Sequence, residues 1–255
     1  WLADICIEGR YHGVSTDKAA NPANLMGATK RFMEHMMFLS EIATGASGTV
    51  TSARFANVAF SDGSLLHSFV NRLNRGQPLA APHSIERFFI SPPEAAAISI
   101  ISAFDAPSGT IIVPKADEGS LKPTKIEIVA ENFLRHFGLE AAIYDDETAA
   151  REHVKVELQR GKYPLLLTRP DTSGEKPVEQ FVSEEEVTLD MGLEKLVAIN
   201  YRRTAVGPVL SAFEELNDLV NADQAVTKKQ IANILGRAIP LLAHSETGRN
   251  LDERM

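Results

Sequence analysis

Residues 11–44 limit most strongly what this chain can fold into, because they read as a strand, a polar loop and a long helix in direct succession. Residues 11–15 tolerate a β-strand, and the polar residues 16–18 follow where that strand should end. Asn21-Pro22 is a good helix start, since Asn can cap free amides and Pro loses no needed donor there. Apolar residues then recur near helical period over residues 25–42. This unit predicts an α/β sheet whose ligand binds at the strand end.

The rest of the chain supports a parallel sheet. A second strand is expected over residues 49–58, and two strands joined by a long helix imply a parallel sheet covered on its faces. The other expected segments are a short helix over 1–9, helices over 65–73, 94–104 and 125–137, extended pieces over 78–81, 110–114, 154–158 and 165–168, and a helical tail over 206–255. The tail carries an apolar stripe of Val209, Phe213, Leu216, Leu219 and Val220. Such a stripe favours packing on the domain or on a neighbouring subunit.

Ionisable side chains gather around the end of the first strand. Met26 and Lys30 are four residues apart on the helix and share a face, so Lys30 can point back toward the loop that carries Asp17 and Lys18. An acid and two amines in one cleft stabilise each other's charged forms, whereas burial opposes both charges. The group is therefore a candidate for proton transfer. The alternative is that Asp17 and Lys18 form only a surface ion pair.

Composition argues against several classes of protein. The formal net charge of −8 over 255 residues disfavours a nucleic-acid partner, whose phosphates need an excess of Lys and Arg. Cys6 is the single cysteine, so no intrachain disulfide can form, and a reducing, cytoplasmic compartment is expected. No apolar run reaches the ~18 residues of a membrane span. Residues 1–7 have neither an initiator Met nor the order of a signal peptide, so the sequence is expected to begin in mid-domain, with an upstream membrane segment left open.

Other catalytic and metal patterns are missing from the sequence. The seven His residues include no pair at ligand spacing with a supporting carboxylate or thiol, so no metal site is expected. No Gly-x-Ser-x-Gly elbow follows a strand, which argues against serine hydrolysis. The Gly-rich phosphate loop of a dinucleotide fold is also missing, and truncation of the sequence explains this better than loss of the loop.

Residues 15–30, Ser-Thr-Asp-Lys-Ala-Ala-Asn-Pro-Ala-Asn-Leu-Met-Gly-Ala-Thr-Lys, resemble the active-site segment of the extended short-chain dehydrogenase/reductases. More narrowly, they resemble the polysaccharide-biosynthesis (CapD-like) branch that contains the UDP-N-acetylglucosamine 4,6-dehydratases. The superfamily usually has Tyr-x-x-x-Lys, whereas this chain has Met26-x-x-x-Lys30, and a thioether cannot take up a proton. A subset of the dehydratase branch is similar in carrying Met here, so the open question is which group handles the proton of the sugar 4-hydroxyl.

Two further blocks resemble the sugar-nucleotide side of that family. Residues 54–58, Arg-Phe-Ala-Asn-Val, followed by a Ser/Gly-rich turn, imply ligand contacts for Asn57 and Ser64. The alternative is a strand followed by an ordinary turn. Residues 86–96 resemble a Thr-Arg-Tyr-Phe-Met-x-x-x-Glu-Ala block, in which the Arg, here Arg87, reaches the diphosphate with its planar fork of donors. The alternative is an ordinary surface Arg.

A third block resembles the family's Arg-Pro-Gly-Glu-Lys-x-x-Glu-Glu, with Asp171-Thr172-Ser173 inserted before the Gly. The resemblance implies that Arg169 and Lys176 help to hold the nucleotide. It also implies that Glu175 accepts hydrogen bonds from a ribose or a base.

The fold class that the resemblance implies is α/β, with a Rossmann-like parallel sheet, a smaller substrate-binding part and a helical tail. The C-terminal half of the Rossmann domain is expected here, and its N-terminal strands and NAD-binding loop are expected upstream. Residues 1–182 would form this partial NAD-binding domain with an interleaved sugar-nucleotide-binding part. Residues 183–255 would form a mostly helical C-terminal extension.

The activity implied is NAD- or NADP-dependent 4,6-dehydration of a UDP-sugar, UDP-N-acetylglucosamine first among them, by a homo-oligomer. Lys18 would be the base at C5 and Asp17 the acid at C6. Thr16 would hydrogen-bond the 4-oxygen, Lys30 would hold the nicotinamide ribose, and Ser15 would also contact the cofactor.

Two alternatives stay open at this point. A nucleotide-sugar 4-epimerase of the same superfamily would keep the cofactor and fold but need neither a base at C5 nor an acid at C6. A non-catalytic scaffold derived from a dehydratase would explain Met26 as a sign of decay.

Overall fold

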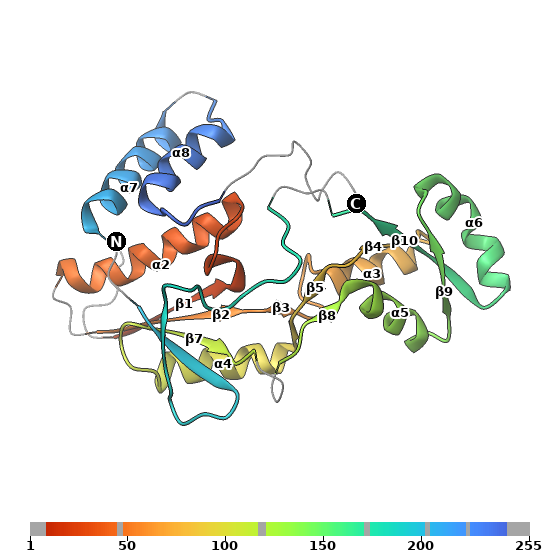
Figure 1. Ribbon diagram of the computed structural model, residues 1–255, viewed down its shortest axis with the longest axis horizontal. Helices are drawn as coiled ribbons and strands as arrows, with labels where there is room; N and C mark the ends of the chain where they lie inside the picture. The colour runs from red at the N-terminus through yellow and green to blue at the C-terminus, as the bar shows by residue number, and fades with distance from the viewer. Residues whose placement is uncertain are drawn as a thin grey trace.

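The computed structural model describes residues 9–44, 48–116, 121–170, 174–201, 205–222 and 225–243, with the side chains of 40–44 excepted. Within them the chain forms a larger lobe around a five-stranded sheet and a smaller lobe around a three-stranded sheet (Figure 1). The short helix expected over residues 1–9 and the single cysteine fall on residues 1–8, outside the described part. In the described part, no helix is long and apolar enough to cross a membrane.

The larger sheet has the strand order β1-β2-β7-β12-β11. Its strands are β1 (Arg10–Thr16), β2 (Thr49–Phe55), β7 (Thr110–Pro114), β12 (Leu196–Asn200) and β11 (Val187–Leu189). The first three run parallel, with Gly13 opposite Ser52 and Ala53 opposite Ile112, whereas β12 is antiparallel to β7. Helix α2 (Leu25–Thr44) covers one face and α4 (Pro92–Phe104) covers the other (Figure 1). The expected α/β class with a parallel sheet is therefore confirmed.

Two expected boundaries in this sheet are wrong. The strand expected over 49–58 ends at Phe55, because the chain then turns to pair Asn57–Val58 (β3) with Phe89–Ile90 (β6). Residues 187–200 were expected in the helical extension, yet they form β11 and β12 and complete the larger sheet. The alternation of apolar and polar residues in 187–200 is too weak to predict a strand from the sequence. The pairing of β12 with the buried β7 decides the structure of these residues.

Helix α2 begins at Leu25, later than expected. The Asn24 Oδ1 atom accepts the Gly27 amide at 2.9 Å, so Asn24, and not Asn21, supplies the cap. The intervening residues form a 3-10 turn, η1 (Asp17–Ala19), whose N-cap is Thr16. A Cβ atom on Gly27 would lie 2.6 Å from the Lys18 carbonyl oxygen. The small residue thus lets the turn pack directly against the first turn of the helix.

The smaller lobe is a second parallel α/β unit. Its strands β4 (Leu79–Pro82), β10 (Lys162–Thr168) and β9 (Glu140–Tyr144) lie in that order, with α3 (Leu65–Asn74), α5 (Ile126–His136) and α6 (Glu147–Gln159) around them (Figure 1). A short antiparallel pair, β5 (Glu86–Arg87) and β8 (Thr124–Lys125), lies beside it. Its core centres on the fully buried Phe69, Leu79, Leu134 and Leu165.

The extended piece expected over residues 154–158 is wrong, because these residues are part of α6. Alternating Val154, Val156 and Leu158 mimic a strand, but only Val154 is buried. The Asp146 side chain accepts the Ala149 amide at 2.7 Å and starts the helix instead.

The tail forms two helices, α7 (Val206–Asn221) and α8 (Lys228–Ala238), which pack on the outer face of α2 (Figure 1). Val209 and Leu235 are fully buried there against Ala28 and Phe32. The expected helical tail is confirmed over α7 and α8, and of the two expected partners, the domain or a neighbouring subunit, these helices pack on the domain; residues 244–255 lie outside the described part. The expected stripe is only partly right, since Phe213 is 47% and Val220 82% exposed.

Candidate functional site

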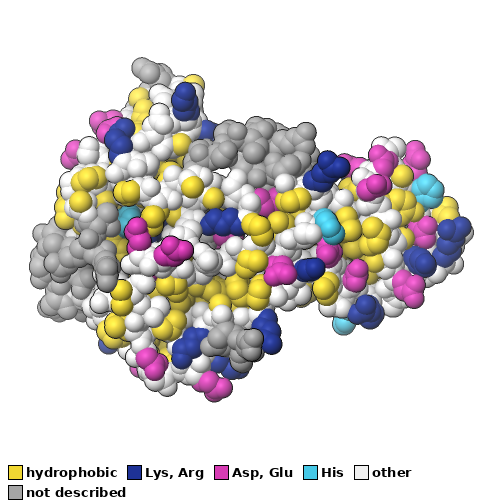
Figure 2. Space-filling model, in the orientation of Figure 1, with side chains coloured by type: hydrophobic (Ala, Val, Ile, Leu, Met, Phe, Trp, Pro, Cys, Tyr) yellow, Lys and Arg dark blue, Asp and Glu magenta, His cyan; other side chains and the backbone are white. Residues whose placement is uncertain are grey.

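The candidate site lies where β1 ends and the chain turns into η1, at the carboxyl edge of the parallel strands. Ligands of open α/β sheets bind at this edge. The Thr16 side chain caps η1, which places Asp17 in the first position of the turn. The face of the molecule shown in Figure 2 carries charged side chains of both signs, interspersed with apolar areas.

Asp17 is the most deeply buried ionisable residue of this turn, with a side chain 1% exposed. Its Oδ1 atom accepts three hydrogen bonds, from Thr16 Oγ1 at 2.8 Å, the Lys18 amide at 2.9 Å and Lys18 Nζ at 3.0 Å. Its Oδ2 atom is buried and has no partner among the described residues. The two oxygens of one carboxylate are therefore unlike, and Oδ2 is the one left for a ligand or a proton.

The side chain of Lys18 is 21% exposed, so the pair that it forms with Asp17 is not an ordinary surface ion pair. Lys30 Nζ donates to the Val14 carbonyl oxygen at 3.2 Å, two residues before Thr16. Met26, one helical turn earlier, is 48% exposed. The structure thus holds the acid and both amines at one strand end, as the spacing predicted.

Ser15 is oriented differently from its neighbours. Side chains alternate along β1, so Ser15 and Gly13 face α2, whereas Val14 and Thr16 face away. Ser15 lies near Glu34 of α2, but its buried hydroxyl has no partner of normal hydrogen-bond geometry among the described residues. A cofactor contact by this residue stays a prediction.

A segment that we call the strap, residues 174–186, returns from the smaller lobe and crosses the larger one (teal in Figure 1). Gly174 has φ +71°, and a Cβ atom there would lie 2.3 Å from the Ala23 carbonyl oxygen. Lys176 Nζ donates to the Asn21 carbonyl oxygen, and Asn21 donates to Gln180 Oε1 at 2.7 Å. The strap is therefore docked on the loop between η1 and α2. The inserted residues 171–173 lie outside the described part.

The other expected substrate residues lie on the side of the smaller lobe. Arg87 NH1 donates to the carbonyl oxygens of Glu86 at 2.8 Å and Lys176 at 2.9 Å, so it holds the strap. Asn57 donates to the Phe88 carbonyl oxygen at 3.0 Å, and Ser64 caps α3. Each of these side chains has a structural role in the described part, and their contacts with a ligand stay predictions.

The strap ends at a buried ion cluster that sequence reasoning missed. Arg54 of β2 is 0% exposed and pairs in a bidentate manner with Glu34 of α2, at 2.9 and 2.8 Å, and with Glu186 of the strap, at 2.7 and 2.6 Å. It also donates to the Phe181 carbonyl oxygen at 2.8 Å. Arg31 contacts both carboxylates. The signal in the sequence was an Arg inside an otherwise buried strand, together with a Glu one helical turn after Lys30.

Burial and pairing oppose each other in this cluster. Burial alone would raise the pKa of Glu186, but hydrogen bonds from Arg54 and the charges of Arg54 and Arg31 lower it to about 2. Burial also opposes the charge of Glu34, and Arg54 still lowers the pKa of that carboxyl. Both carboxylates therefore stay ionised at neutral pH, and two cations balance them.

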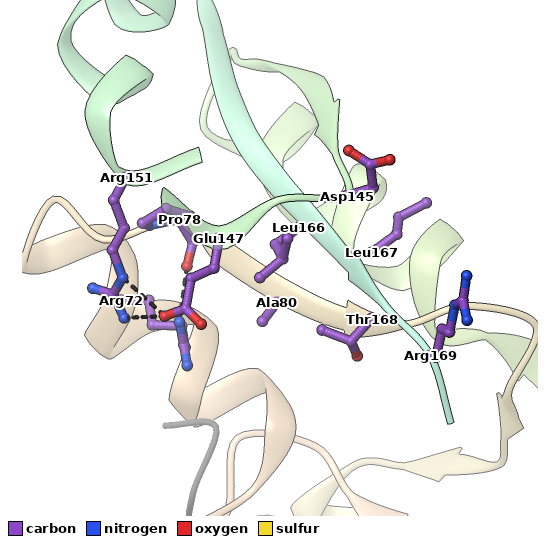
Figure 3. A pocket seen from close by; sticks show the side chains of 10 residues that line it. All are labelled: Arg72, Pro78, Ala80, Asp145, Glu147, Arg151, Leu166, Leu167, Thr168 and Arg169. Carbon is purple, nitrogen blue, oxygen red and sulfur yellow. Dashed lines mark hydrogen bonds and ion pairs between the residues drawn. The ribbon is translucent and has the colours of Figure 1, made fainter. Parts of the chain in front are cut away.

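Two cavities lie away from the end of β1. One, of about 420 Å³, lies over β4 and β10 in the smaller lobe, and Arg169 lines it with Arg72 and Arg151 (Figure 3). A Glu147 carboxylate pairs with Arg151 there at 2.6 Å. The other, of about 580 Å³, is lined by His35 and Tyr201, which contact each other. Burial, followed by the charge of Arg31, lowers the pKa of His35 to about 4.

No group of three His, Cys, Asp or Glu side chains in the described ranges could hold a metal ion. The site is therefore built from amines, one carboxylate and hydroxyls. The residues present fit a nicotinamide cofactor, because Lys30 donates to a main-chain carbonyl at the carboxyl edge of the sheet and the buried Asp17 Oδ2 has no hydrogen-bond partner in the described part.

Comparison with known proteins agrees with this geometry. The family model described as "Polysaccharide biosynthesis protein" matches residues 9–200, which end with the last strand of the larger sheet. The capsular polysaccharide biosynthesis protein CapD of Staphylococcus aureus is 37% identical over 126 residues, 49% of this chain and 20% of that protein. The probable polysaccharide biosynthesis protein EpsC of Bacillus subtilis is 31% identical over 212 residues, 82% of this chain and 31% of that protein. The chain thus spans under a third of the length of these two relatives.

Two further similarities bear on the activity and the fold. A UDP-glucose 4-epimerase of Rickettsia akari is 30% identical over 127 residues, 49% of this chain and 36% of that enzyme. The X-ray structure of Pen from Bacillus thuringiensis superimposes with a TM-score of 0.57 at 21% identity, over 84% of this chain and 62% of that one. The latter supports the fold alone.

Proposed function

The chain belongs to the polysaccharide biosynthesis protein family within the extended short-chain dehydrogenase/reductases, and on that premise we propose that it carries the catalytic residues of a nucleotide-sugar 4,6-dehydratase. UDP-N-acetylglucosamine is the proposed substrate, and the product is its 4-keto-6-deoxy derivative. The observation that supports the proposal best is the Asp17–Lys18 pair, in which one buried carboxylate oxygen accepts three hydrogen bonds and the other has no hydrogen-bond partner in the described part. An acid beside a base is what loss of water across C5 and C6 requires.

NAD or NADP, when bound, supplies the oxidation at sugar C4 and the later reduction at C6. In this chain, Lys30 is the proposed cofactor residue, because its ammonium lies on the Val14 carbonyl oxygen at the strand end. There it is placed to hold the nicotinamide ribose and to add positive charge beside the reacting sugar. The Gly-rich phosphate loop is not part of this sequence, so the binding of the cofactor's diphosphate is not assigned to these residues.

The Asp17–Lys18 pair can supply both the base and the acid from one shared proton. Lys18 Nζ and Asp17 Oδ1 are 3.0 Å apart, and passage of that proton to the carboxyl group leaves a neutral amine beside a neutral acid. Because Oδ1 already accepts three donors, the acid proton belongs on Oδ2. The Lys18 amine then removes the C5 proton, and the Asp17 proton leaves with the 6-hydroxyl as water. Afterwards Lys18 returns its proton to C5.

Thr16 is the proposed contact of the sugar 4-oxygen. Its hydroxyl donates to Asp17 Oδ1 at 2.8 Å, so its lone pairs are directed to accept from the 4-hydroxyl. The 4-hydroxyl loses its proton during the oxidation at C4, before water leaves. Over the whole turnover that released proton balances the one that Asp17 gives to the water, and the Asp17–Lys18 pair regains one proton from solvent before the next cycle. Met26 takes no part in this proton balance, because a thioether carries no exchangeable proton.

The test is to incubate the complete protein with UDP-N-acetylglucosamine and to follow the product by mass spectrometry and NMR. The proposal expects a loss of one water and a 4-keto-6-deoxy sugar, and Lys18→Met should abolish both. The runner-up is a 4-epimerase, favoured by the similarity to the Rickettsia enzyme. A 4-epimer of unchanged mass, formed equally well by Lys18→Met, would decide for it. A protein that binds no NAD and acts normally with Lys18→Ala would be a scaffold.

A further inference from the structure

The buried cluster of Arg54, Glu34 and Glu186 joins three parts of the molecule that are distant in sequence. Arg54 is the penultimate residue of β2, Glu34 lies on α2, and Glu186 ends the strap. Arg54 makes five hydrogen bonds to its three partners, counting the Phe181 carbonyl oxygen, at 2.6 to 2.9 Å. All its nitrogens are used, so the guanidinium has one orientation and fixes both carboxylates in the plane of its fork.

Each carboxylate is close in the chain to a residue of the candidate site. Glu34 lies one helical turn after Lys30, on the same face of α2. Glu186 is the terminal anchor of the strap, whose other end touches Asn21 through Lys176 and carries Glu175. Arg87 holds the strap from the opposite side, through the Lys176 carbonyl oxygen. Arg54 therefore ties the end of the strap, through Glu186, to the helix that carries Lys30.

We propose that Arg54 is a positioning residue of the sugar-nucleotide site, which fixes the strap and its substrate residues against the helix that carries Lys30. The inference rests on the proposed function, since it takes Arg87 and Glu175 as substrate contacts. Arg54 itself touches no substrate: it is fully buried under the strap. Its role is to align two contact surfaces that belong to different lobes.

A purely stabilising role would be a poor reason for such a cluster. Replacing buried ion pairs by apolar side chains of similar volume is often neutral or stabilising, so the burial of Arg54 and Glu34 with the half-buried Glu186 is better explained by a demand for a defined orientation. Apolar packing is non-directional and would let the strap slide. The bidentate fork allows only one register of strap and helix.

The experiment compares Glu186→Gln with Glu185→Gln in the complete protein. Glu185 is the exposed neighbour of Glu186, so its substitution makes the same chemical change without touching Arg54. Binding of UDP and of NAD is measured separately by calorimetry, and amide hydrogen exchange reports on the strap. Arg54→Lys is the second variant, because an ammonium keeps the charge but cannot hold three partners in one plane.

The expected result for Glu186→Gln is a Kd for UDP raised by about tenfold or more, the size of a lost charged hydrogen bond, with the Kd for NAD within about twofold. The strap amides should exchange faster, and Glu185→Gln should match the wild type. Arg54→Lys should likewise raise the Kd for UDP and leave the Kd for NAD nearly unchanged. Should it fail to fold, Glu186→Gln alone carries the test.

Equal UDP affinity in Glu186→Gln and Glu185→Gln would overturn the positioning role, even if Glu186→Gln had a lower melting temperature. A wild-type protein that binds UDP but forms no 4-keto-6-deoxy sugar would overturn the dehydratase proposal alone, since UDP affinity still decides the role of Arg54. A wild-type protein without affinity for UDP would overturn both.

Discussion

The molecule contains two carboxylate–cation groups that differ in one respect. In the cluster around Arg54, every donor nitrogen and both carboxylates are engaged, and the central side chain is 0% exposed. At the end of β1, Asp17 is as deeply buried, but one of its oxygens has no partner in the described part of the chain. A saturated group can only hold structure, whereas an unsaturated one has a position left for a substrate or a proton.

Removing one charge should reduce the stability of the protein by different amounts in the two groups. Removing a charge from the saturated group leaves its partner buried and unpaired, so stability falls. Exchanging Asp17 for its amide should cost less, because the amide oxygen can still accept hydrogen bonds from Thr16 and the Lys18 amide, and the one cationic neighbour described, Lys18, is partly exposed. Function and stability should therefore separate between the two groups, and each of the following experiments tests that separation.

The largest effect is expected for Asp17→Asn. The amide cannot give a proton to the 6-hydroxyl, so the rate of dehydration should fall by about 10²–10⁴-fold. The free energy of unfolding should change by only about 1 kcal/mol, since the amide oxygen of Asn can still accept the hydrogen bonds that Asp17 Oδ1 receives. Product formation and urea unfolding are measured on the same preparation. A variant that loses stability in proportion to activity would show that Asp17, like Arg54, mainly holds the structure.

Arg54→Met should give the opposite pattern. It leaves the carboxylates of Glu34 and Glu186 with Arg31 as the remaining cation described and the Ser183 amide as a further donor to Glu186, and breaking a buried pair typically costs about 3–5 kcal/mol. Urea unfolding measures the loss. The double variant Arg54→Met with Glu34→Gln should recover part of it, because one uncompensated charge is then removed. No recovery would mean that the charges are not the cause.

Acid should destabilise the protein through the same cluster. The pKa of Glu186 is lowered to about 2, so its contribution to stability is complete above the ordinary value of 4.5 and is lost as the pH falls through about 2. A shift of this size corresponds to up to ~3 kcal/mol. Between pH 5 and pH 2, the free energy of unfolding should therefore fall more steeply with decreasing pH in the wild type than in Glu186→Gln. An equal pH dependence of the unfolding free energy in the two proteins would contradict a lowered pKa of Glu186.

The smallest effect is expected for Met26→Leu. The side chain is half exposed and carries no exchangeable proton, so we expect the rate to change by less than about threefold and stability by less than ~0.5 kcal/mol. Steady-state kinetics check this, with Asp17→Asn as the contrasting variant. A large loss would show that the thioether shapes the sugar site, although it cannot transfer a proton.

Much of the fold and site could be predicted locally. The strand over residues 110–114, the helix after Ser64 and the gathering of Asp17, Lys18 and Lys30 at one strand end follow from period, turn residues and helical spacing. The start of α2 could not be placed, because Asn21 and Asn24 are equally good caps and packing of Gly27 on Lys18 decides between them. The alternation of apolar residues over 154–158 wrongly predicted a strand. The Asp146 cap and the single buried face of α6 outweigh that local pattern.

The sequence by itself determined which residue types stand at the end of the first strand and that they share a family with polysaccharide biosynthesis proteins. Only the tertiary structure decided that one Asp17 oxygen is saturated and the other open, that Arg54 is buried, and that the strap ties Arg87 to the loop before α2. The physical reason is range. Helical period and capping act over a few residues, whereas Arg54 and Glu186 meet across 132 positions, and such a contact exists only once both lobes have packed.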